Sequence, residues 1–132
     1  MRPHNSGHWS MDGAYTSQFE QHLRAVLDYP LGATGPLAPV TVMGNVIGAA
    51  EPPEMSMDER VHHLFARMPE AKVHLYGKSE RPGRKIGHVN VLGAAGGSLD
   101  DEAYVADVRE RATRAAHWLS HGVWTDGWDP HD

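Results

Sequence analysis

Three short runs of β-branched and apolar residues set the main constraint on how this chain folds. Residues 40–48 read VTVMGNVIG, residues 72–76 alternate apolar and polar side chains, and residues 86–92 are again rich in valine. β-branched residues favour strands, and alternation turns one side of a strand toward a core. The first run is nearly all apolar, which suits a buried strand. A loop containing Pro and Gly separates the last two runs and predicts an antiparallel hairpin.

Three further segments carry helical periodicity, and each begins with a capping pattern. Ser17, Ser56 and Ser98 each precede an acidic residue by three positions. The hydroxyl can accept from a first-turn N–H while the acid reaches back. Pro30 and Pro69 end the first two segments. The apolar stripes, spaced for one helix face, are Phe19, Leu23, Val26 and Leu27, then Met57, Val61, Leu64, Phe65 and Met68, then Tyr104, Val108, Ala112, Ala115 and Leu119, the last set expected to point inward.

The order helix, strand, helix, hairpin, helix predicts an α+β fold with a small, largely antiparallel sheet. A length of 132 residues corresponds to about one domain or part of a larger one. Residues 32–39 are rich in turn signals and are expected to join two subdomains. We therefore expect a unit at 1–35, an α+β domain at 36–125 with flanking helices, and a frayed tail at 126–132.

Composition excludes several classes of protein. The formal net charge is −5, from 12 basic and 17 acidic residues, which argues against a general nucleic-acid binder. There is no cysteine, so disulfides and thiolate metal sites are excluded and the cytoplasm is the simplest compartment. No secretory signal precedes the first helix, and no apolar run reaches the ~20 residues of a membrane span. No nucleic-acid or membrane partner is expected.

A basic cluster stands out against this acidic balance. Residues 78–85 read KSERPGRK and hold four of the 12 basic residues. Arg presents a forked pair of donors to phosphate oxygens and Lys adds a mobile charge, so the cluster can bind an oxyanion. A solvated hairpin loop, kept soluble by its charges, explains the same residues. Both interpretations stay open. The four cations are Lys78, Arg81, Arg84 and Lys85.

A second polar cluster lies at residues 2–9, RPHNSGHW. Short polar side chains around Gly7 are typical of a ligand-contacting loop, because glycine lets a ligand approach the backbone. His4 and His8 have the spacing of helical metal ligands, but the surrounding residues disfavour a helix and no HExxH pattern accompanies them. We expect no bound transition metal. The remaining paired histidines are expected to be structural: His62, His63, His117 and His121.

Several motifs in the correct order resemble one enzyme family. RPHNSGHW and TSQFEQHLRAVLDYPLG resemble the end of the ATP-grasp domain of carboxyaminoimidazole ribonucleotide synthases, the ATPase subunit of phosphoribosylaminoimidazole carboxylase. HLYGKSERPGRKIGHVNVLG resembles the signature of their small C-terminal domain, and VTVMGNVIG lies between them as expected. The resemblance covers residues 2–92. It implies that residues 1–35 are the C-terminal end of an ATP-grasp domain.

The family resemblance implies an ATP-dependent ligase of purine biosynthesis. Such enzymes use ATP and Mg to activate bicarbonate and carboxylate the amine of aminoimidazole ribonucleotide, releasing ADP and phosphate. By matching position, the resemblance implies a catalytic role for Lys78. It places Arg81, Arg84 and Lys85 at an anion site, with Asn5, Ser6 and His8 lining the ribonucleotide pocket. A homodimer is compatible with it.

The sequence departs from the family pattern at its start. The family has an acidic pair with an Asn-Glu step, which holds magnesium, just before the stretch matching Arg2, and this sequence has Met1 there. We therefore expect the isolated chain to bind no cofactor and to be inactive. Two other interpretations remain: a non-catalytic binding or oligomerisation module that reuses this domain, and a histidine-based metal enzyme.

Overall fold

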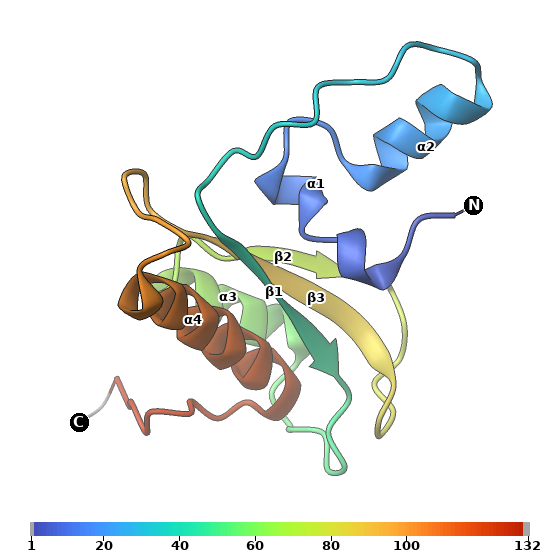
Figure 1. Ribbon diagram of the computed structural model, residues 1–132. Helices are drawn as coiled ribbons and strands as arrows, with labels where there is room; N and C mark the ends of the chain where they lie inside the picture. Colours follow the sequence, from blue (N-terminus) through green and yellow to red (C-terminus); the bar gives the residue numbers. More distant parts are fainter. Residues whose placement is uncertain (1, 131–132) are drawn as a thin grey trace.

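The computed structural model describes residues 2–130 and forms a three-stranded sheet backed by helices (Figure 1). Figure 1 shows α3 and α4 side by side on one face of the sheet, α1 over the opposite face, and α2 farther out. In chain order the elements are η1 (Asn5–Gly7), α1 (Ser10–Gly13), α2 (Gln18–Val26), β1 (Thr41–Ile47), α3 (Met57–Arg67), β2 (Lys72–Leu75), β3 (Lys85–Leu92) and α4 (Glu102–His121).

The sheet has the order β1-β3-β2, and both strand pairs are antiparallel. The predicted α+β class, the small antiparallel sheet and the hairpin of β2 and β3 are confirmed. The expectation that residues 40–48 form the buried strand is wrong. That run forms β1, an edge strand that is only partly buried. The central strand is β3, because it pairs along both edges and is covered on both faces.

The core lies between the sheet and the two long helices. Val89 and Val91 of β3 are fully buried and belong to one apolar cluster with the inward face of α4. Gly44 of β1 lets α4 approach closely, since a Cβ there would lie 2.9 Å from the carbonyl oxygen of Ala112. The inward face predicted for α4 is confirmed for its four fully buried members, Val108, Ala112, Ala115 and Leu119.

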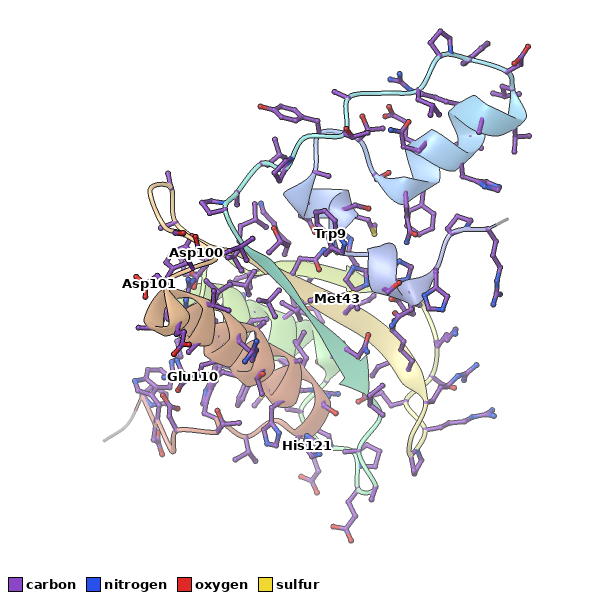
Figure 2. The ribbon with its side chains drawn as sticks, in the orientation of Figure 1. Trp9, Met43, Asp100, Asp101, Glu110 and His121 are labelled. Carbon is purple, nitrogen blue, oxygen red and sulfur yellow. The ribbon has the colours of Figure 1, made fainter. Side chains whose placement is uncertain are left out.

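Two of the three predicted caps are confirmed and the third is wrong. The Ser17 hydroxyl accepts from the backbone N–H of Glu20 at 3.1 Å, and Ser56 caps α3 in the same way at 3.2 Å. α4 is instead capped by Asp101, whose carboxylate accepts from the first-turn N–H groups at 3.1 and 3.2 Å. Ser98 accepts from the N–H of Asp100 and serves the preceding turn. Asp101, at the start of α4, and His121, in its last turn, are labelled in Figure 2.

The N-terminal segment differs from expectation in its local structure. Residues 5–7 form one 3₁₀ turn and residues 10–13 a single helical turn, where no helix was expected. The apolar stripe predicted for the first helix exists on α2 but faces outward. Its members are between 37% and 68% exposed: Phe19, Leu23, Val26 and Leu27.

The C-terminal segment packs against the end of α3. The guanidinium of Arg67 stacks on the rings of Trp124 and Trp128, at 4.4 and 4.5 Å from their centroids. It also forms an ion pair with Asp126, and this pair lowers the pKa of that carboxyl to about 2. Of the segment expected to fray, the described part, 126–130, thus has defined contacts, and residues 131 and 132 lie outside the described residues. None of the helices described here is long and apolar enough to span a membrane.

Candidate functional site

The basic loop between β2 and β3 is anchored through its backbone. The N–H of Gly83 donates to the carbonyl of Gly48 at 2.9 Å, and the N–H of Gly48 donates to the carbonyl of Arg84 at 2.7 Å. A Cβ at Gly48 would collide with the carbonyl oxygen of Arg81, so only glycine allows this close approach. The loop is therefore fixed against the segment that follows β1.

Side chains fix the loop as well. Glu80 pairs with the buried guanidinium of Arg60 through two hydrogen bonds of 2.9 and 2.6 Å. Arg84 donates to the hydroxyl of Ser79 at 3.1 Å within the loop. Lys78 and Arg81 are exposed. The backbone and side-chain anchors argue against a loosely solvated loop and hold its cations on a stable base.

Two lysines flank the ring of Tyr76, the residue just after β2. The amines of Lys78 and Lys85 each lie 5.7 Å from the ring centroid, within the range of cation–π attraction. Burial, and then the charge of Lys78, lower the pKa of Lys85. Burial raises the pKa of the Tyr76 hydroxyl. Both cations thus lie beside the same aromatic surface at the edge of the loop.

Three stacked imidazoles continue from this tyrosine across the sheet. His88 lies between His8 and His74, with ring centroids 4.9 and 4.6 Å away. It is 1% exposed and shares a hydrogen bond of 2.7 Å with the Tyr76 hydroxyl. Burial, and then the neighbouring His74, His8 and Lys85, lower the pKa of His88 to about 4. The central imidazole is therefore neutral at pH 7.

Asp12, in α1, joins the N-terminal segment to the sheet. One carboxylate oxygen accepts from His74 Nε2 at 2.7 Å and from the Asn90 amide at 2.7 Å. The same amide donates to the carbonyl of His8 at 3.1 Å. Figure 2 labels Trp9 of the N-terminal segment and Met43 of β1, on the two sides of this interface. The contacts hold His8 against the polar face of the sheet.

Gln18 of α2 sets the orientation of His8. Its amide donates to His8 Nδ1 at 2.8 Å and to the carbonyl of His4 at 2.7 Å. Because Gln18 donates, Nδ1 of a neutral His8 accepts and Nε2 carries the proton. Burial, and then Lys85, His74 and His4, lower the pKa of His8. His8 therefore presents an uncharged N–H donor.

The structure brings together only some of the residues expected at a site. His8, Lys78 and Lys85 lie around Tyr76, while Asn5 and Ser6 lie in η1, where the Ser6 hydroxyl contacts His4 at 2.9 Å. Sequence reasoning missed five members of this polar cluster. Four of them share the polar sides of β2 and β3, a pattern visible as alternation in HLY and HVN. The five are Asp12, His74, Tyr76, His88 and Asn90.

Known proteins match the chain over most of its length. Residues 41–102 match the family model of the phosphoribosylaminoimidazole carboxylase C-terminal domain. The chain is 71% identical over 131 residues to N5-carboxyaminoimidazole ribonucleotide synthase of Mycobacterium tuberculosis (strain H37Rv), covering 99% of this chain and 28% of that protein. It is 52% identical to the Corynebacterium ammoniagenes enzyme of the same name, covering 97% of this chain and 29% of that one.

Two solved structures share the fold. The phosphoribosylaminoimidazole carboxylase ATPase subunit of Aquifex aeolicus superposes with a TM-score of 0.64 at 40% identity, covering 85% of this chain and 30% of that one. The Aspergillus clavatus N5-carboxyaminoimidazole synthase in complex with ADP and aminoimidazole ribonucleotide gives 0.61 at 36% identity, covering 81% and 28%.

Fold and matches together define the class, because the chain corresponds to the C-terminal part of the ATP-grasp enzymes that it matches. Within that class, the chain belongs to the N5-carboxyaminoimidazole ribonucleotide synthase family. It spans about 28 to 30% of the length of the relatives it matches.

Proposed function

We propose that this chain forms the ribonucleotide-facing part of an enzyme that carboxylates aminoimidazole ribonucleotide with bicarbonate at the expense of ATP. The products are N5-carboxyaminoimidazole ribonucleotide, ADP and phosphate. The observation that carries the proposal is the anchored cationic loop, which gathers four basic residues on a fixed base in a chain of net charge −5. A similar enzyme of known structure is described in complex with ADP and this ribonucleotide, which supports the same substrates here.

The loop cations suit the charge of these substrates. The ribonucleotide carries a 5′-phosphate, and the carboxyphosphate formed from ATP and bicarbonate is also anionic. Lys78 and Arg84, held at the two ends of the loop, contact phosphate oxygens in this proposal, with Arg81 and Lys85 adding positive potential. Charged donors fixed in advance stabilise transferring phosphoryl and carboxyl groups more than mobile ones do. The ribonucleotide amine then attacks the carboxyl carbon and inorganic phosphate leaves.

The N-terminal segment supplies neutral donors. His8 carries its proton on Nε2 and is neutral, so it suits a ribose hydroxyl rather than a phosphate charge. Asn5 and Ser6 lie on the adjoining 3₁₀ turn and extend this polar surface. The described residues include no group of three His, Asp or Glu side chains placed to hold a metal. The magnesium of the reaction therefore has no set of ligands among them. The cytoplasm, where purine precursors are made, suits the cysteine-free composition.

The test uses a chimeric enzyme in which this chain replaces the matching C-terminal part of the mycobacterial relative. Lys78→Ala and Arg84→Ala are each expected to lower kcat/KM for the ribonucleotide roughly tenfold to a hundredfold, the cost of losing a charge-assisted contact, ~1.5–3 kcal/mol. A higher KM alone assigns the residue to the ribonucleotide phosphate. Lower turnover at saturation assigns it to the transferring group, as expected for Lys78.

Lys72→Ala is the matched control, because Lys72 is an exposed lysine on β2 outside the loop. Its kinetic constants should equal those of the unmodified chimera. If Lys78→Ala and Arg84→Ala, shown to be folded by thermal melts, also keep those constants, the loop is a solvated turn and the assignment is wrong.

A further inference from the structure

Arg60 is the most deeply buried charged residue among those described, with 0% of its surface exposed. It lies in the first turn of α3 and sends two donors to the two carboxylate oxygens of Glu80, at 2.9 and 2.6 Å. This fork-to-fork geometry is the strongest form of a side-chain ion pair and fixes both direction and distance. Glu80 lies in the middle of the basic loop, between Lys78 and Arg81.

The other donors of Arg60 hold the guanidinium in place. Its Nε donates to the carbonyl of Met55 at 3.1 Å, just before α3, and Nη1 donates to the carbonyl of Leu119 at 2.5 Å, in the last turns of α4. The backbone carbonyl of Arg60 accepts in turn from the indole N–H of Trp118 at 2.8 Å. The two long helices and the loop thus meet at a single guanidinium, which ties the loop to the rigid core.

This arrangement also controls the charge of the loop. A free glutamate at position 80 would pair with the neighbouring cations and repel an incoming anion. Arg60 draws the carboxylate inward instead, so that the cations of the loop stay available at the surface, where Lys78 and Arg81 are exposed. One buried pair therefore both orients the loop and neutralises its only acidic side chain.

We propose that Arg60 and Glu80 are positioning residues for the ribonucleotide phosphate. They contact no substrate and act through Arg84, so the inference rests on the proposed function of the loop. The positioning role and simple electrostatics predict opposite changes in anion binding when the charge of Glu80 is removed. Removing a negative charge from an anion site by electrostatics alone leaves anion binding unchanged or stronger. If the pair positions the loop, the same change weakens binding.

Glu80→Gln in the chimeric enzyme is the test. The amide keeps the size of the side chain but loses the double charge-assisted bond, so the loop is no longer held in one position. We expect KM for the ribonucleotide to rise on the order of tenfold, the scale on which small misplacements of binding groups act, with kcat at saturation changed less than about twofold. Glu80→Asp keeps the charge but is one methylene shorter, and its KM should rise by less.

Glu70→Gln is the matched control, because Glu70 also pairs with an arginine, Arg111, at 3.3 Å on the surface away from the loop. It should leave KM unchanged. An unchanged or lower KM in either Glu80 variant, with the protein folded at the assay temperature, overturns the positioning role. If Arg84→Ala raises KM or Lys78→Ala lowers kcat while the Glu80 variants leave KM unchanged, the positioning inference alone fails. If neither the loop variants nor the Glu80 variants alter kcat or KM, the proposed function of the loop fails with it.

Discussion

His88 stays neutral in a pH range in which an ordinary histidine gains a proton. Its pKa is lowered to about 4 from 6.5, mainly by burial, so the folded state stays unprotonated where the unfolded state binds a proton. The groups that face it are His74, His8, Lys85 and the carboxylate of Asp12, together with the Tyr76 hydroxyl. Stability is then full above pH 6.5 and is lost as the pH falls toward 4.

The lowered pKa of His88 predicts that the protein becomes less stable as the pH falls. We expect the free energy of unfolding to fall by up to about 3 kcal/mol between pH 6.5 and pH 4, measured by denaturant titration at several pH values. In His88→Gln most of that slope should disappear, with a remainder from His8, whose pKa is lowered as well. His62→Gln, at an exposed position on α3, should keep the full slope. A slope retained by His88→Gln would show that other groups cause it.

The polar cluster around His88 was out of reach of local sequence patterns. Asp12 meets His74 and Asn90 across 62 and 78 residues, and neither spacing carries any periodic signal. The alternation of β2 does predict that His74 and Tyr76 share a face. It does not predict that this face is covered, because the cover comes from the N-terminal segment and depends on tertiary packing.

At the scale of single elements, local signals succeeded where the chemistry was local. Ser17 and Ser56 cap their helices through contacts three residues away, which the sequence displays directly. At α4 two residues that can cap lie close together, and the sequence pattern selected Ser98. The structure selects Asp101, which lies next to the first helical residue and reaches two N–H groups at once.

The assignment of Asp101 as the cap of α4 can be tested by two substitutions. Asp101→Ala should reduce the free energy of unfolding by about 1 kcal/mol, since it removes two capping bonds and a negative charge at the positive end of a 20-residue helix. Ser98→Ala, in the same loop, should change it by less than about 0.5 kcal/mol. Denaturant titration of both variants decides between the two caps. The reverse ranking would restore the capping role to Ser98.

The composition of the strands did not predict their order in the sheet either. The run of β1 is more continuously apolar than that of β3, yet β3 is central and fully covered while β1 lies at an edge. The difference arises because β3 carries His88 and Asn90 on a face that the N-terminal segment buries. Polar residues can be buried when they form hydrogen bonds with residues outside their own hairpin, so the apolarity of a strand does not by itself predict its burial.

At the scale of the whole molecule, the N-terminal segment differs from the rest in how little of its apolar surface is buried. α2 buries none of its residues fully, and its apolar stripe is open to solvent. Contiguous apolar surface of this kind marks a contact face. The relatives matched by the chain are more than three times its length, and the residues of the stripe lie within the region that matches them. We infer that in an enzyme as long as these relatives this face packs against the part of the protein outside the matched region.

The last prediction concerns catalysis by the 132-residue chain on its own. We expect no magnesium-dependent production of ADP from ATP with bicarbonate and aminoimidazole ribonucleotide, measured by a coupled ADP assay. The described residues offer no group of three His, Asp or Glu side chains that could hold a metal, and the α2 face is uncovered. Phosphoryl transfer needs metal ions that bridge the ATP phosphates, and a cationic loop alone does not replace them.

Complementation sharpens this test. Adding the separately purified first part of the mycobacterial relative, up to the start of the matched region, should restore ADP production if the α2 face completes the enzyme. Leu23→Glu places a charge in the centre of that face, where Leu23 is 59% exposed, and should weaken complementation without unfolding the chain. Arg84→Ala guards against contaminants, because a contaminating ATPase would be indifferent to it. ADP production by the chain alone that Arg84→Ala abolishes would show that these 132 residues hold a complete active site.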